Sequence, residues 1–206
     1  MRIFVITFLL LVSTGCGQMQ EVRTIKQGNA ADTIKSDIKT MDSDYSPTFE
    51  KAHPVAKRLM NDEFYFSVIE GTAPFGSDDG ADTYAGFKSW RPAHSSESPI
   101  RFLQDQIEDW GYPQFDIKET SFEKLMPYLK ENHSGFRAMT GIDAAIVATA
   151  FGQLYLEGTI AGDIKDLAKI SVKRELLPEI LAFWEEDANV RQAKLHKLMK
   201  VLEEVE

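Results

Sequence analysis

Cysteine is almost absent from this chain of 206 residues, which holds a single one, Cys16. One cysteine excludes an internal disulfide. Basic clusters are also lacking, since 23 Lys and Arg stand against 32 Asp and Glu and the formal net charge is -9. A nucleic-acid partner requires a basic face that neutralises phosphates. We therefore expect no nucleic-acid partner, and the acidic balance favours basic partners instead.

Motifs that identify an enzyme are lacking as well. The chain has no G-x-S-x-G nucleophile elbow, no phosphate-binding loop and no dinucleotide fingerprint. Its four histidines are scattered, without the H-x-x-x-H spacing typical of zinc sites. The sequence therefore predicts no metal site of this kind and no cofactor. Catalysis by dispersed serine or carboxylate side chains stays open.

The N-terminus is the most apolar end of the chain. Arg2 precedes an apolar stretch over 3–12, and small residues follow at 13–15. This pattern predicts a signal peptide at 1–15, and the stretch is too short for a membrane span, which needs about 20 residues. The segment "VSTGC" resembles the lipobox of bacterial lipoproteins, although Ser13 stands where that family prefers Leu.

The lipobox resemblance implies that Cys16 is the lipidation site, carrying fatty acyl chains such as palmitate and becoming the first mature residue. An alternative is ordinary signal cleavage further along, which would discard Cys16. Residues 16–48 are polar and predict a flexible tether. The expected location is the periplasmic side of a bacterial membrane, and Gly17, where an Asp would retain the protein at the inner membrane, favours the outer membrane.

Residues 49–206 predict one mainly α, compact helical domain with one or two short strands. Ser98 and Gly111 mark the two ends of a helix over 99–110. The final segment, 189–206, has apolar residues at the spacing of an amphipathic helix. Short strands are expected at 63–70, which is aromatic and β-branched, and at 115–117.

A further helix is expected where Thr140 and Asp143 form a capping-box pattern. The stretch from there to residue 156 is apolar on nearly every side, which is typical of the central helix of a bundle. It is shorter than a membrane span requires. We therefore expect it at the centre of the domain.

The most unusual stretch is "TAPFGSDDGADTYAGF", residues 72–87. Three interpretations of its acidic side chains are open: Ser77 or Asp78 caps a helix, the stretch forms a binding surface, or its carboxylates bind a cation. The spacing departs from the calcium loop D-x-[DN]-x-[DN]-G. The candidate binding residues are Asp78, Asp79, Asp82, Tyr84 and Trp90.

The segment "HPVAKRLMNDEFYFSVIEGTAPFGSDDGADTYAGFKSWR" resembles the YfeS-like proteins, a bacterial family described as uncharacterised. The likeness extends from His53 to about Trp110, and "FGSDDGAD" is its most specific part. Some relatives are discussed alongside WGR domains, but "DWGYP" contains no WGR motif, so no nucleic-acid role follows. The resemblance implies no established activity and no catalytic residues.

Two functions are consistent with these patterns. The first is an exported, lipid-anchored binding or protein-interaction module of the bacterial cell envelope, for example an immunity protein that neutralises a basic toxin. Its partners would be the membrane, through the anchor, and a protein or envelope component. The alternative is a metal-dependent or hydrolytic enzyme that uses the acidic loop from Gly76 to Asp82.

Overall fold

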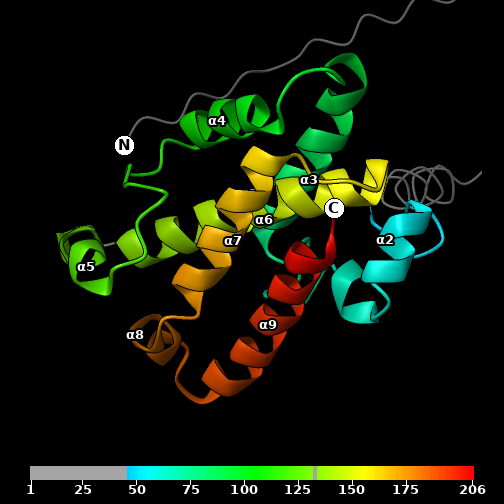
Figure 1. The fold of residues 1–206 in the computed structure, drawn as a ribbon. Helices are drawn as coiled ribbons and strands as arrows, with labels where there is room; N and C mark the ends of the chain where they lie inside the picture. Colours follow the sequence, from blue (N-terminus) through cyan, green and yellow to red (C-terminus); the bar gives the residue numbers. More distant parts are fainter. Residues whose placement is uncertain (1–45, 132–133) are drawn as a thin grey trace, which may run out of the picture. The chain divides into compact units, whose positions relative to one another are not determined.

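The computed structural model describes residues 46–131 and 134–206, which lie in one compact unit. The predicted signal peptide, Cys16 and residues 17–45 of the predicted tether lie outside the described residues. The elements are α2 (Pro54–Leu59), η1 (Glu63–Phe66), α3 (Asp78–Trp90), η2 (Arg91–Ala93), α4 (Pro99–Trp110), α5 (Phe122–Glu131), α6 (Gly135–Glu157), α7 (Gly162–Glu175), α8 (Pro178–Leu181), η3 (Ala182–Asp187) and α9 (Ala188–Glu204). The predicted mainly α fold is confirmed (Figure 1).

The two short strands expected at 63–70 and 115–117 are wrong, because the described residues contain no strand. In the first segment, Asp62 accepts a hydrogen bond from the backbone N–H of Phe64 at 2.9 Å and starts the 3-10 helix η1. The second segment is irregular. Aromatic and β-branched residues favour strands only where neighbouring strands exist to pair with them.

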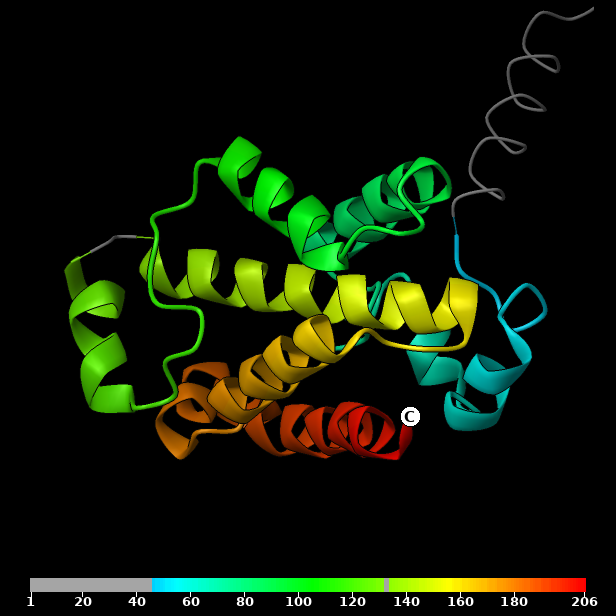
Figure 2. The ribbon, with the colours of Figure 1, turned by 45° about the horizontal axis from the view of Figure 1, so that its top comes forward.

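Helix α6 runs through the middle of the described unit (Figure 2). Its most extensive contacts are with α3 and α7. The helix begins at Gly135, so the capping box expected at Thr140 is wrong. The Thr140 hydroxyl donates within the helix to the Phe136 carbonyl at 3.0 Å, and Asp143 pairs with Arg174. The helix is therefore longer than the sequence pattern indicates.

With 23 residues and a mean hydropathy of 1.2, α6 is long and apolar enough to cross a membrane. The expectation that this stretch is too short is therefore wrong. However, 83% of its apolar window is buried inside the domain. A helix that is apolar all round and packed on most sides is typical of a protein core, and we interpret α6 as the central core helix.

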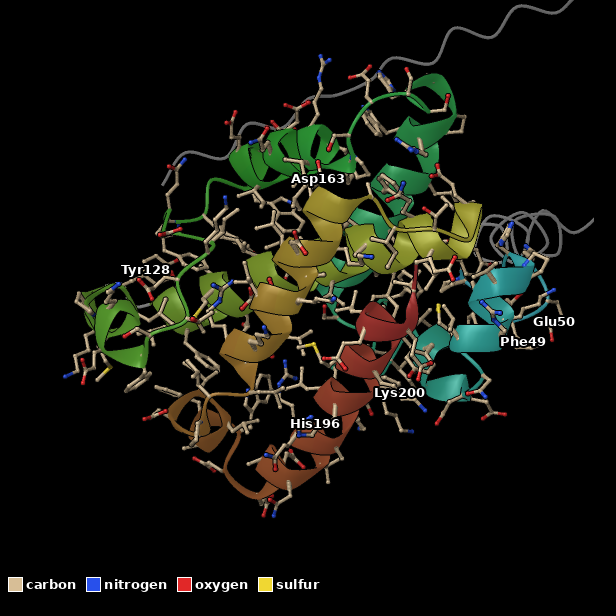
Figure 3. All side chains as sticks on the ribbon, in the orientation of Figure 1. Phe49, Glu50, Tyr128, Asp163, His196 and Lys200 are labelled. Atoms are coloured by element: carbon tan, nitrogen blue, oxygen red, sulfur yellow. The ribbon has the colours of Figure 1, made fainter. Side chains whose placement is uncertain are left out.

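The helices with clear signals at their ends are confirmed. In α4, the Ser98 hydroxyl accepts from the Ile100 N–H at 3.2 Å, and Gly111 ends the helix with a φ of 63°. In α9, the apolar face is buried and packs against α7 and η3. Figure 3 labels His196 and Lys200 on this helix, and both are exposed.

The chain enters the domain beside Tyr155 of α6. The Tyr155 hydroxyl accepts from the Thr48 N–H at 3.2 Å and donates to the Thr48 carbonyl at 3.1 Å. Pro47 is buried. Residues 46–48 therefore pack against the domain, and Phe49 and Glu50 follow beside α2 (Figure 3).

Candidate binding site

The "FGSDDGAD" segment, residues 75–82, forms the junction between a loop and α3. The Ser77 side chain accepts a hydrogen bond from the Gly80 N–H at 3.1 Å, and α3 begins at the next residue. This is the N-cap arrangement that satisfies a free backbone donor at a helix start. The cap interpretation is therefore confirmed for Ser77.

The two glycines of the segment allow a close approach between backbones. A Cβ atom on Gly76 would overlap the carbonyl group of Glu70. A Cβ atom on Gly80 would lie 2.8 Å from the carbonyl oxygen of Pro74, closer than real Cβ contacts. The first turn of α3 can therefore pack directly on the 70–76 loop only because both positions lack side chains.

The three aspartates of the segment do not converge on a common point. Asp79 is buried, forms an ion pair with Arg137 of α6 and accepts a hydrogen bond from the Tyr112 hydroxyl at 2.7 Å. Asp78 and Asp82 are exposed. No set of three His, Cys, Asp or Glu residues arranged for a metal ion occurs within 46–131 and 134–206.

Tyr84 and Trp90 belong to aromatic clusters on α3. Tyr84 is 2% exposed and its ring centroid lies 4.5 Å from that of Phe75. Burial raises the pKa of its hydroxyl above the ordinary value. Trp90 is half-buried and stacks on the His94 ring at 4.4 Å. Both side chains pack against the protein, and neither lines the cavity described next.

A cavity of about 320 Å³ lies beside the start of α3, and we name it the motif cavity. It is bordered by the 71–79 segment, α6, the end of α7, η3 and α9. Its residues are Gly71, Thr72, Ala73, Pro74, Gly76, Ser77, Asp78, Asp79, Arg137, Thr140, Ala144, Val147, Glu175, Trp184, Arg191, Leu195 and Leu198. Of the five predicted binding residues, the cavity brings together Asp78 and Asp79.

A buried ion pair between Glu175 and Arg191 forms one wall of the motif cavity. The side chains are 6% and 9% exposed, and the guanidinium Nε donates to Glu175 Oε2 at 3.0 Å. Burial raises the pKa of the Glu175 carboxyl, whereas Arg191 opposes that rise. A carboxyl with a perturbed pKa beside a cavity is a common feature of functional sites.

Arg191 also connects the wall to two further elements. Its Nη1 donates to the Thr72 hydroxyl at 3.2 Å, and its guanidinium lies 3.8 Å from the centre of the Trp184 ring. The buried Trp184 Nε1 has no hydrogen-bond partner among the described residues. Buried polar groups of this type normally find a partner, so this N–H is a donor for which the described chain supplies no acceptor.

Sequence reasoning missed Glu175, Arg191 and Trp184. One signal could have found Arg191: it lies at i−4 from Leu195, on the apolar face of α9 that Leu198 continues. An arginine on such a face must find a buried partner. No comparable signal marks Glu175, which stands beside charged residues at the end of α7.

A second hollow of about 280 Å³ adjoins the motif cavity, and we name it the outer hollow. It shares Gly71, Thr72, Trp184 and Arg191 with the motif cavity and adds Glu70, Asp187, Val190 and Lys194. Lys194 donates to Glu70 at 2.5 Å. The two hollows together border α9, η3 and the 70–79 segment.

Comparison with known proteins provides no family for the chain: no family model matches it, and no curated protein or solved structure does either. The resemblance of residues 53–110 to the YfeS-like proteins stays a prediction.

Proposed function

We propose that this protein is an exported, lipid-anchored binding module of the bacterial cell envelope, and that the motif cavity is its binding site. The observation that supports binding is that arginines hold two of the cavity's acidic side chains in place. Asp79 is paired with Arg137, and Glu175 is paired with Arg191. The arginines hold both carboxylates in fixed positions on the cavity wall, an arrangement that suits recognition of a partner.

The alternative, an enzyme that uses the Gly76–Asp82 loop, gains no support from this geometry. Metal-dependent hydrolysis requires ligands that converge on one ion. In this loop, Asp79 turns toward Arg137 whereas Asp78 and Asp82 are exposed. We therefore place the binding module first.

The second part of the proposed function is a lipid anchor at Cys16. Acyl chains on Cys16 would hold the domain at a membrane surface, because each buried methylene contributes about 0.8 kcal/mol. The polar residues 17–45 separate Cys16 from the described domain. Labelling cells with a fatty-acid probe tests this step. The full chain should carry the label and Cys16→Ala should not; equal labelling of both chains would contradict lipidation.

Crosslinking in cells tests binding at the cavity. A photoreactive residue in place of Val190, which is 53% exposed on the outer hollow, should give one discrete adduct with an envelope component. The same residue in place of Asp105, which is exposed on α4 and lines neither hollow, should give none. Equal adducts from both positions would contradict a binding site at this face.

A pocket-filling variant provides the second control. Ala144 lines the motif cavity from α6, so Ala144→Leu should occupy part of the cavity without changing any charge and should reduce the Val190 adduct. Ala193→Leu adds the same volume on the exposed side of α9 and should leave the adduct unchanged. If Ala144→Leu folds normally and the adduct persists, the motif cavity is not the binding site.

A further inference from the structure

One exposed large apolar side chain lines the outer hollow, and two others are sequence neighbours of its lining residues. Val190, which lines it, is 53% exposed, and Ile69, next to the lining residue Glu70, is 91% exposed. Phe183, next to Trp184, is 50% exposed. An exposed apolar side chain at a hollow, as at Val190, is a feature of surfaces that contact another protein.

Carboxylates outnumber cations among the side chains that line the two hollows. Each lining cation has its own carboxylate: Arg137 pairs with Asp79, Arg191 with Glu175 and Lys194 with Glu70. Two lining carboxylates, Asp78 and Asp187, form no ion pair among the described residues, although Arg137, which is paired with Asp79, also attracts Asp78. Asp78 lies on the motif cavity and Asp187 on the outer hollow. With each lining residue counted once, the two hollows together hold five carboxylates against three cations, a net charge of -2.

The residues next to Asp187, and the described chain as a whole, also carry net negative charge. Glu185 and Glu186 are exposed and directly precede Asp187. Over the whole of residues 46–206, the chain holds 18 Lys and Arg against 27 Asp and Glu, which accounts for the full net charge of -9. A surface of this charge attracts a cationic partner and opposes an anionic one.

Building on the binding function proposed above, we propose that the partner presents a basic segment of protein chain to this face. Its cationic side chains pair with Asp78 and Asp187, and an apolar side chain of the segment packs on Val190. A peptide suits the site better than a small amine. The two carboxylates belong to adjoining hollows of about 320 and 280 Å³, and the exposed Val190 lines the outer one.

Short blocked peptides test this assignment. Peptides with two lysines and a leucine, at several lysine spacings, are titrated against the purified domain and against matched peptides with glutamate in place of lysine. We expect the lysine peptides to bind and the glutamate peptides not to bind. The Asp78→Asn/Asp187→Asn variant should weaken lysine-peptide binding about fivefold to tenfold, since each exposed ion pair contributes modestly.

A charge-matched variant separates the site from the general acidity of the chain. Asp105 and Asp109 are exposed on α4 and line neither hollow, so Asp105→Asn/Asp109→Asn should leave the affinity nearly unchanged. Ser77 caps α3 and the Asp187 side chain makes no cap hydrogen bond, so the Asn variants remove no cap, and melting confirms that each variant folds. The reversed variant Asp78→Lys/Asp187→Lys should instead bind the glutamate peptides.

Three results would overturn the basic-segment assignment: no binding of any lysine peptide, equal weakening by the two Asn variants, or preference of the unmodified domain for glutamate peptides. Each of these is compatible with a Val190 adduct that depends on Ala144, in which case the binding function stands and only the partner chemistry is wrong. If the Val190 adduct does not form, or does not depend on Ala144, the proposed binding function itself is wrong.

Discussion

Arg174 and Arg191 are both buried in this domain, and they occupy different surroundings. Arg174 and its partner Asp143 are both 0% exposed, and the guanidinium donates to both carboxylate oxygens. Arg191 and its partner Glu175 lie on the wall of the motif cavity, where Nε and Nη2 share one oxygen. An arginine–carboxylate pair thus stabilises the core at Arg174 and borders the motif cavity at Arg191.

The partners of the remaining donors explain the difference. Nη1 of Arg174 donates to the carbonyls of Ile117 and Glu119 at 3.0 and 2.7 Å, which fixes the irregular segment between α4 and α5. Nη1 of Arg191 donates to the Thr72 hydroxyl, which fixes the loop before α3. Arg174 therefore acts within the core, whereas Arg191 shapes the cavity.

The largest expected effect is that of Arg174→Met. This variant leaves the Asp143 carboxylate buried without its cation and removes the donor of two carbonyls. The free energy of unfolding, measured in urea, should fall by about 3 to 5 kcal/mol. Adding Asp143→Leu should recover part of this loss, because the unpaired charge is gone. A loss below about 1 kcal/mol would show that Arg174 has no such structural role.

Arg191→Met should cost less, about 2 to 3 kcal/mol at neutral pH, because the Glu175 carboxyl borders a cavity. Burial already raises the pKa of Glu175 in the folded protein, and loss of the cation raises it further. A carboxyl with a raised folded-state pKa stabilises the protein below its unfolded pKa and loses that contribution as pH rises. The loss in free energy of unfolding caused by Arg191→Met should therefore be smaller at pH 5 than at pH 8.

Urea titrations at the two pH values check this expectation, with Glu175→Gln/Arg191→Met as the control. The double variant has no titrating carboxyl at this wall, so its deficit should vary much less with pH. A deficit of Arg191→Met that grows toward low pH would contradict the proposed environment of Glu175.

The same two arginines show which parts of the molecule could be predicted from the sequence. The ends of α4 depend on local signals, Ser98 and Gly111, and were predicted correctly. The start of α6 is not predictable in this way, because no side-chain hydrogen bond caps the helix and Thr140 with Asp143 matches a capping-box pattern further along. An aspartate three residues after a threonine favours a cap locally, but a buried arginine from α7 determines its actual contact.

The candidate site divides in the same way. The cap at Ser77 is local and could be predicted. The cavity is not local, because its wall joins Thr72 to Arg191 across 119 positions of the chain. Tyr84 and Trp90 were included as binding residues because aromatic side chains serve both cores and surfaces. Only the packing of α3 on α6 distinguishes the two environments.

Thr72→Val tests the connection between Arg191 and the loop before α3. Valine has a similar volume and lacks the hydroxyl that accepts from Arg191 Nη1, so the free energy of unfolding should fall by about 1 kcal/mol. The exposed Thr159 provides the control, and Thr159→Val should have almost no effect. Equal effects of the two variants in urea titrations would show that the Thr72 bond does not contribute.

The smallest expected effect is that of Lys194→Met, which breaks a partly exposed pair at the outer hollow. Lys194 and Glu70 are 25% and 33% exposed, so the loss should be about 0.5 kcal/mol and should shrink in high salt. The hydrogen bond from Lys194 lowers the pKa of Glu70, so its stabilisation is present above the unfolded pKa and is lost in acid. The stability of the variant should approach that of the unmodified protein below pH 4.

Lys200→Met is the control, because it removes a more exposed pair, in which Lys200 lies 3.8 Å from Glu204. It should cause no measurable change in the free energy of unfolding. A larger effect at Lys200 than at Lys194 would contradict the expectation that buried pairs contribute more than exposed ones.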